Sequence, residues 1–261
     1  MATKKRIFGW LTVSFVAVLL LLYFVGPRVF WVWQARKMVR DVPIAGAMPR
    51  DLPTFAANPT RGSLVAVSNY EFEVPWSDLD RARMKTIGAM SVVPFLSSTT
   101  LIVATPKWND AVSQTGKDAV ANIVTCVRGV YGPAATQSDL AFWSAVYSTN
   151  PRDITFFTNP DRATLMGMIL MAKAVAPPTN DPTIFRLHYG GFQGFQLGNP
   201  DHHLTTAQIL VYDSNGGIEI TISHRTQPEV MGEFSQADMN RIITTLRHTD
   251  QKLAMVEVTT Q

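Results

Sequence analysis

Asp201, His202 and His203 follow one another directly and form the local cluster with the clearest capacity for chemistry. A carboxylate and two imidazoles are ligands that zinc accepts, but zinc sites usually space their ligands along the chain and include a further one. No spaced third ligand accompanies this cluster. We therefore interpret the three residues as an exposed loop between two hairpins. They remain the candidate metal ligands of the sequence, and we expect no cofactor.

Two glutamates and one cysteine are further candidates for chemistry. Glu71 and Glu73 would suit a pair of acid and base catalysts. They alternate with apolar residues, which predicts that both lie on the solvated face of a strand. Cys126 is the single cysteine, so an internal disulfide is excluded, and its apolar helical surroundings predict a buried thiol. The sequence contains no nucleophile elbow, no P-loop and no zincin motif.

The last third of the chain predicts a framework of strands. Gly190-Gly191 lies between two segments of alternating character and supplies the two residues of a tight hairpin. The polar turn at residues 213–217 joins a second pair of strands, so four antiparallel strands are expected. Ser235, with Asp238 three residues later, resembles a capping box and begins an amphipathic helix. Such a helix should lie across the sheet.

The middle of the chain predicts three helices, within residues 109–175. The third has Asn159 as its N-cap, Pro160 at its first position and Lys173 in its last turn. Residues 165–171 are apolar on all sides, which predicts a buried helix whose methionines fill the core rather than bind a soft metal. Strands are predicted before this helical block, at residues 64–67, 70–74, 90–96 and 101–104.

The run Ile7–Pro27 predicts a membrane anchor. It holds 21 residues without a formal charge, and at about 1.5 Å per residue a helix of that length spans the roughly 30 Å hydrocarbon layer. A cleaved signal peptide is the alternative, because residues 1–6 form a basic tail. The run is longer than the usual apolar segment of a signal peptide, and the nearest small-x-small tripeptide, residues 45–47, lies well beyond it. We therefore expect an uncleaved signal-anchor.

Aromatic and basic side chains flank this anchor, where the interfaces of a bilayer favour them. Membrane lipids are consequently expected as partners. The residues predicted to contact the interface are Trp10, Tyr23, Trp31, Trp33, Arg36, Lys37 and Arg40.

Charge separates the anchor from the remainder of the chain. Residues 1–40 hold seven Lys and Arg and no acidic residue, whereas residues 41–261 hold 16 basic against 20 acidic residues, a net charge of −4. The later part has no basic stripe, so nucleic acid is excluded as an expected partner. Basic residues are nearly balanced around the anchor, and the cluster next to the chain start favours a cytoplasmic N-terminus with an extracytoplasmic domain at the cell (inner) membrane.

Proline and glycine mark the expected domain boundaries. Residues 28–62 read as a juxtamembrane segment followed by a Pro-rich linker in the form of an extended tether. One α+β domain is expected over residues 63–250, because its length suffices for a substantial core. Residues 251–261 read as a C-terminal tail.

A family resemblance adds to this picture. The run from Gly191 to Arg247, with its GFQGFQLGNP segment, polar hairpin and closing helix, resembles the C-terminal half of the Mog1/PsbP-like α/β sandwich. The resemblance implies an antiparallel sheet flanked by helices that serves mainly for docking onto partners. The chain departs from it in the anchor and in the long helical insertion. More generally, the chain is similar to bacterial single-pass membrane proteins.

The expected function is a membrane-anchored interaction or regulatory domain without catalytic activity, bound to a protein partner. Two other classes stay open. One is a hydrolase or metal-dependent enzyme with a scattered site, and the other is a domain that binds a lipid or small molecule. A deep pocket with converging polar groups would favour these two, whereas a flat apolar patch would favour docking.

Overall fold

The structure is a computed structural model, and the anchor falls almost wholly outside the part that it describes. Residues 1–22 and 24, which include Trp10 and most of the Ile7–Pro27 run, are not among the described residues. Within the described part, no helix has both the length and the apolar character needed to cross a bilayer. The described residues are 23, 25–27, 29–53, 56–60, 62–105, 117–179, 181–214, 216–224, 234–249 and 257–260.

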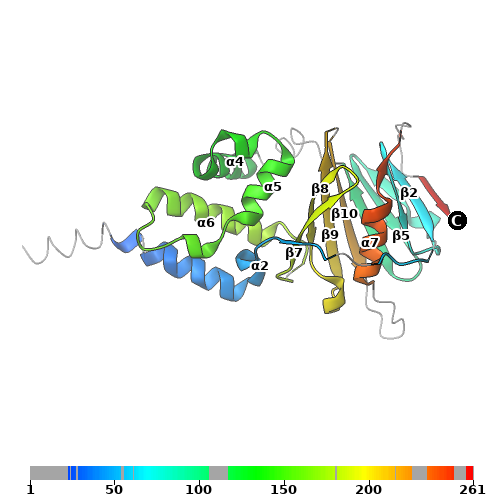
Figure 1. Ribbon diagram of the computed structural model, residues 1–261, viewed down its shortest axis with the longest axis horizontal. Coiled ribbons are helices and arrows are strands. Elements are labelled where there is room, and N and C mark those ends of the chain that lie inside the picture. Colours follow the sequence, from blue (N-terminus) through cyan, green and yellow to red (C-terminus); the bar gives the residue numbers. More distant parts are fainter. Residues whose placement is uncertain are drawn as a thin grey trace, which may run out of the picture.

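These residues form an α+β fold with a large antiparallel sheet flanked by helices, as expected (Figure 1). Neighbouring strands of the large sheet are antiparallel except at one edge, where β1 runs parallel to β7. In spatial order the sheet consists of β1 (Arg50–Asp51), β7 (Ile184–Tyr189), β8 (Phe192–Leu197), β9 (Thr206–Asp213), β10 (Gly216–His224), β6 (Thr99–Ala104), β5 (Met90–Pro94) and β4 (Lys85–Ile87).

The two predicted hairpins are confirmed. Tyr189 pairs with Phe192 across Gly190-Gly191, and both glycines have positive φ, at 55° and 89°. Backbone of this kind suits glycine because it has no Cβ to clash. The β9–β10 pair closes between Asp213 and Gly216. Local turn chemistry therefore specifies the centre of the sheet.

A second sheet lies against one face of the large one. Its strands at residues 64–67 and 70–74 were predicted, but the two strands that complete it were not. It joins segments from both ends of the domain, because β12 pairs with β2 and β11 pairs with β3. Residues 257–260, expected to belong to a free tail, thus form an edge strand. The order of the second sheet is β11 (Arg247–His248), β3 (Tyr70–Val74), β2 (Ser63–Val67) and β12 (Glu257–Thr260).

The first core fills the space between the two sheets and α7 (Gln236–Thr245). Phe72 of β3, Val103 of β6 and Ile220 of β10 are completely buried in it. The predicted capping box of α7 is confirmed, because the Ser235 side chain accepts from the Asp238 backbone N–H while the Asp238 carboxylate accepts from the Ser235 N–H. This cap begins the helix where its apolar face meets the sheet.

The second core lies on the opposite face of the large sheet, under a helical half. Leu210 and Tyr212 of β9 point into this core, whereas Ile209 and Val211 point into the first one. Strand β9 is therefore apolar on both faces, as strands covered on two sides are. The helical half comprises the N-terminal helix (residues 29–41), α2 (Pro43–Gly46), α4 (Lys117–Tyr131), α5 (Asp139–Ser148) and α6 (Pro160–Val175).

Two predictions for the helical half are confirmed. The predicted N-cap of α6 is confirmed, because the Asn159 side chain accepts from the Asp161 backbone N–H. The buried thiol at Cys126 is confirmed as well.

Short 3₁₀ helices complete the described elements. They are η1 (Arg81–Arg83), η2 (Pro133–Thr136), η3 (Pro151–Asp153) and η4 (Pro200–His202).

The segment expected to be an extended tether is partly built into the fold. Ile44 and Ala45 of α2 are completely buried in the helical half, and residues 50–51 form β1. The prediction of a free linker is wrong here, because Pro43 occupies a first-turn position of α2 instead of interrupting it. Burial of the apolar residues then outweighs the backbone entropy that an extended tether would retain.

Gly167→Ala is expected to lower the free energy of unfolding by about 1–3 kcal/mol. A Cβ at this position of α6 would overlap ring atoms Cε3 and Cζ3 of Trp31, which packs there from the N-terminal helix. Gly129→Ala in α4 is the matched control. Its Cβ would meet only the flexible end of Leu165, at 2.8 Å, and alanine favours a helix by up to about 1 kcal/mol. Chemical unfolding of the full chain in detergent micelles measures both, and equal stabilities would contradict the packing role of Trp31.

Candidate functional site

A groove of about 540 Å³ runs between the N-terminal helix and the loop that links α5 to α6. Its volume lies within the range of sites that hold small molecules, about 300–1,000 Å³. Apolar side chains form most of its walls, and two arginines, Arg36 and Arg152, stand among them. The lining residues are Val32, Arg36, Val39, Gly46, Asn150, Pro151, Arg152, Ile154, Thr155 and Phe156.

The walls of the groove are held in place by the second core. On one side, Ala35 of the N-terminal helix is buried, which fixes the rotation of that helix and points Arg36 outwards. On the other side, Pro151 and Ile154 are buried, and the Asn150 side chain caps η3 by accepting from the Arg152 backbone N–H. The loop is therefore anchored at both ends of η3, and Arg152 is exposed between them.

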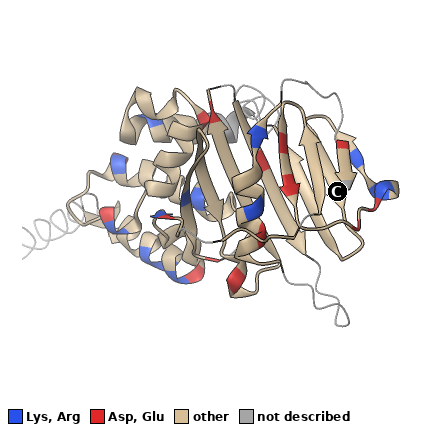
Figure 2. Ribbon diagram, turned by 45° about the vertical axis from the view of Figure 1, so that its right-hand side comes forward, with Lys and Arg blue, Asp and Glu red and all other residues tan. Residues whose placement is uncertain are grey.

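The two charged residues in the lining of the groove, Arg36 and Arg152, are both basic. No acidic residue lines it, and neither Arg36 nor Arg152 has an ion-pair partner among the residues that the structure describes. Figure 2 shows the basic residues along the N-terminal helix, at the lower left of the molecule. Two unpaired guanidinium groups beside apolar walls can bind an anion that carries an apolar portion.

Large apolar side chains are exposed next to this groove. Phe157, one residue beyond the groove lining, is 90% exposed, and Phe30 and Trp33 of the N-terminal helix are each more than half exposed. Large aromatic side chains exposed to this extent are typical of a surface that contacts a membrane or another protein. These aromatic residues belong to the same two segments as the arginine groove, the N-terminal helix and the α5–α6 loop.

The predicted interface residues fall into two groups in the structure. Tyr23, Trp33, Arg36, Lys37 and Arg40 are exposed, and the Lys37 ammonium lies 5.3 Å from the centre of the Trp33 ring. Trp31, by contrast, is partly buried because its ring packs on Gly167. Its packing within the domain was not predicted.

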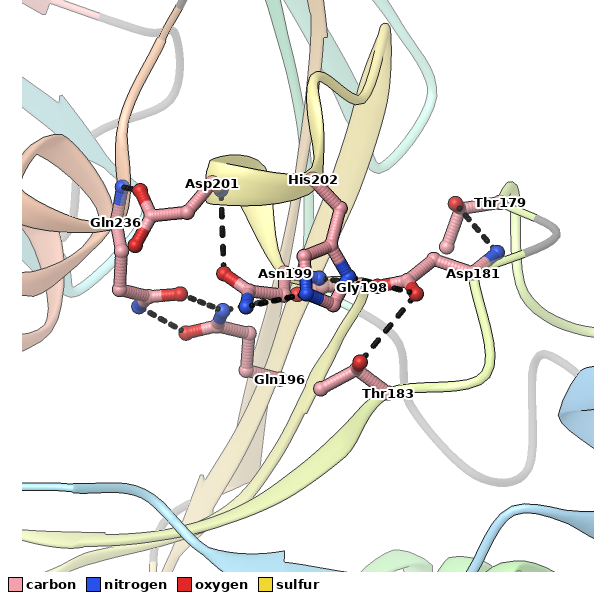
Figure 3. A network of polar contacts seen from close by, with 9 residues as sticks. All are labelled: Thr179, Asp181, Thr183, Gln196, Gly198, Asn199, Asp201, His202 and Gln236. Carbon is pink, nitrogen blue, oxygen red and sulfur yellow. Dashed lines mark hydrogen bonds and ion pairs between the residues drawn. The ribbon is translucent and has the colours of Figure 1, made fainter.

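The histidine cluster occupies η4 and is tied into a polar network (Figure 3). His202 Nδ1 lies 3.2 Å from Asp181 Oδ1, and His202 Nε2 lies 3.2 Å from the side-chain nitrogen of Asn199. Donation from Nδ1–H to the carboxylate and acceptance at Nε2 satisfy both contacts. Both ring nitrogens are then occupied by protein groups. Asp181 itself is buried and accepts a further bond, of 2.6 Å, from the Asn199 backbone N–H.

The other end of this network fastens α7 to the sheet. The Asp201 carboxylate accepts from the Gln236 backbone N–H in the first turn of the helix, at 3.1 Å. The buried side-chain amides of Gln196 and Gln236 donate to each other's oxygen, at 2.6 and 2.8 Å. These polar groups are used to join η4, β8 and α7 (Figure 3). The arrangement is that of a structural junction.

Two of the three metal candidates, Asp201 and His202, therefore make structural contacts. Asp201 accepts from the first turn of α7, His202 bonds Asp181, and His203 ends η4 in the left-handed conformation at φ 57°. Among the residues that the structure describes, no group of three or more His, Cys, Asp or Glu is placed to hold a metal ion.

Lys173 is the most unusual titratable group of the helical half, and sequence reasoning placed it simply in the last turn of α6. It is completely buried, and its ammonium donates to three backbone oxygens, those of Ala47 at 2.5 Å, Tyr147 at 2.7 Å and Thr149 at 3.0 Å. Burial lowers the pKa of Lys173 to about 8. The side chain joins the ends of α2, α5 and α6, where helix carbonyls lack partners.

A smaller cavity of about 260 Å³ lies under α7, between the helix and β7. Arg186 and His188 of β7 and Asn240 of α7 are among its polar lining residues. Its volume falls below the range typical of ligand sites. Of these two cavities, the arginine groove is thus the better candidate for binding.

A third polar cluster joins β11 to the β9–β10 turn. The ring of His248 lies 4.8 Å from that of Tyr70 and 5.6 Å from that of Phe192, and His248 Nε2 contacts the Asp213 carboxylate. Burial and, secondly, the charge of Asp213 raise the pKa of Tyr70 to about 12. This cluster closes the end of the second sheet, and sequence patterns did not predict it.

No protein-family model matches the chain, and no curated protein and no solved structure matches it. The antiparallel sheet flanked by helices stands on the structure itself. The finer resemblance of residues 191–247 to the Mog1/PsbP-like sandwich stays a prediction.

Proposed function

We propose that this chain is a single-pass membrane protein whose folded domain acts by binding, without catalytic activity of its own. In this proposal Ile7–Pro27 is the spanning signal-anchor at the cell (inner) membrane, and the domain lies on the extracytoplasmic side. Membrane lipids contact the helical half, and a protein partner binds the sheet half.

One observation carries the proposal. The N-terminal helix belongs to the core of the domain, because Ala35 is buried there and Trp31 packs on Gly167 of α6. Residues 25–27 are helical as well. A span that ends at Pro27 would therefore enter the folded domain almost directly, without a flexible tether that separates the domain from the bilayer.

This arrangement gives the two halves of the domain different surroundings. In Figure 1 the helices lie between residues 23–27 and the sheets, so the helical half would be the part next to the bilayer. The exposed Phe30, Trp33 and Phe157 belong to that half. Aromatic side chains favour the interface between lipid and water, which agrees with a domain that rests on the membrane surface.

The far end of the large sheet offers a surface for a protein partner. Strand β4 is an edge strand, and all three of its residues are exposed. Ile87, Met90 and Leu96 are exposed around it. An edge strand presents unpaired backbone groups, and exposed apolar residues beside it can fill pockets of a partner that adds a strand.

The membrane proposal predicts that the full chain stays in the membrane pellet after alkaline carbonate washing and retains residues 1–6. A photo-crosslinking amino acid at position 87 or 90 should give the same adduct with one protein in intact membranes. The same amino acid in place of Gln193, an exposed residue on the interior strand β8, is the control and should give none. Soluble protein that begins near Met48, or equal adducts at all three positions, would refute the proposal.

A further inference from the structure

The geometry points to an anionic phospholipid as the occupant of the arginine groove, with its headgroup phosphate bound by Arg36 and Arg152. This inference rests on the proposed function, because it assumes that the helical half lies at a bilayer. It adds the identity of the ligand class and the two residues that recognise it.

The position of the groove along the N-terminal helix favours a lipid. The exposed Phe30 and Trp33 follow Pro27 by three and six residues, which is about 5–9 Å along a helix. The headgroup layer of each leaflet is about 5–8 Å thick, so these two rings would lie at its depth. Side chains on a helix lean towards its N-terminus, and Arg36 therefore extends back from the following turn towards the same depth.

The chemistry of the lining matches an anion with a carbon chain. The planar guanidinium groups of Arg36 and Arg152 suit the paired oxygens of a phosphate. Val32, Val39 and Phe156 supply apolar walls for the glycerol and the first carbons of the acyl chains. None of the described residues that line the groove is acidic, so no carboxylate of this lining neutralises the two charges. A carboxylate of an acidic peptide would satisfy the arginines, but it would leave these walls in contact with water.

The test is a titration of phosphatidylglycerol into the full chain in a neutral detergent, with bound lipid counted by native mass spectrometry. The double substitution Arg36→Gln with Arg152→Gln is expected to weaken binding of the first lipid at least about tenfold, since two charge-assisted hydrogen-bonding groups are lost. The matched control, Arg128→Gln with Arg162→Gln, removes two exposed charges from the same half of the domain outside the groove. It should change the affinity less than about threefold, because exposed charges outside the groove act on the lipid only through electrostatic interactions that salt screens.

Two further measurements distinguish a lipid phosphate from a free phosphate ion and test whether the substitutions disturb folding. Inorganic phosphate in large excess should not displace the lipid, and displacement would overturn the lipid assignment in favour of a free anion. Arg152→Lys keeps the charge but loses the paired donors, so it should bind the lipid more weakly with an unchanged melting temperature. Equal affinities of the wild type and both double variants would overturn the inference.

The outcome is separable from that of the proposed function. Retention of the wild type in the carbonate pellet without any effect of the Arg36 and Arg152 substitutions would reject the lipid site alone. Loss of the wild type from the pellet would reject the membrane anchor itself. Displacement of phosphatidylglycerol by a peptide rich in glutamate, but not by inorganic phosphate, would show that the groove binds an acidic partner and would also overturn the inference.

Discussion

Ile220→Asp is expected to abolish the cooperative unfolding transition of the domain, whereas Thr221→Asp, one residue further along β10, leaves the transition in place. Ile220 is completely buried between the two sheets. A carboxylate at this position would lose its hydration without gaining a partner, at a cost on the order of 5 kcal/mol. That cost is comparable to the whole stability of a typical domain, about 5–15 kcal/mol.

The control residue lies on the opposite face of the same strand. Thr221 is partly exposed, and its hydroxyl lies 3.4 Å from the side-chain nitrogen of Gln208. Its replacement should lower the free energy of unfolding by about 1 kcal/mol, as is usual for a half-exposed site. Far-ultraviolet circular dichroism during urea unfolding distinguishes the two variants. Equal transition midpoints would show that the alternation of β10 does not set its buried face.

The sequence predicts this sheet well where the specifying residues are close together along the chain. Gly190-Gly191 defines one hairpin, and Ser235 with Asp238 defines the start of α7, because turn and cap chemistry acts within a few residues. In the second sheet the pattern predicts β2 and β3, but its two edge strands have no such signal. Strand β11 contains two residues, and β12 pairs with β2 from the other end of the domain. Pairing over such a distance in sequence is set by the assembled core, which local patterns do not describe.

The candidate site was predicted only in part, for the same reason. Arg36 was expected at a membrane interface because it is close to the anchor in sequence. Arg152 carries no local signal of its own, and it joins Arg36 only when the α5–α6 loop folds against the N-terminal helix. The tether prediction failed because Pro43 fits the first turn of a helix as well as it fits an extended segment. Long-range packing decided between these two structures.

The burial of Lys173 could not be predicted from the sequence either. It is the basis of a second prediction about the stability of the fold. Helical periodicity places it in the last turn of α6, where a lysine is ordinarily exposed. In the structure it is completely buried and bonds three carbonyl oxygens. Lys173→Met keeps most of the side-chain volume but leaves the oxygens of Ala47, Tyr147 and Thr149 without this donor. Each buried acceptor that loses its partner costs about 1–3 kcal/mol.

Two effects oppose each other in this variant at pH 7. Loss of the three hydrogen bonds destabilises the fold, while removal of a buried charge relieves a desolvation penalty, which is the reason that the pKa of Lys173 is lowered to about 8. We expect the hydrogen bonds to dominate, with a net loss on the order of 3 kcal/mol. Lys85→Met on the exposed strand β4 is the matched control and should be nearly neutral. If the Lys173→Met variant is as stable as the wild type, the three hydrogen bonds of Lys173 do not stabilise the fold.

The pH dependence of the stability of the wild type and of Lys173→Met tests whether the pKa of Lys173 is lowered. The pKa of Lys173 is about 8 in the folded chain against a model value of 10.5, so between these values the unfolded chain binds more protons. Stability contributed by this group must therefore rise with pH from 8 towards 10.5 and stay constant below pH 8. The difference in free energy of unfolding between the wild type and Lys173→Met should consequently grow from pH 8 to pH 10, by up to about 3 kcal/mol. Urea unfolding of both proteins at matched pH removes the contribution of tyrosines such as Tyr70, and a difference that stays constant over this range would refute the burial of a titrating ammonium.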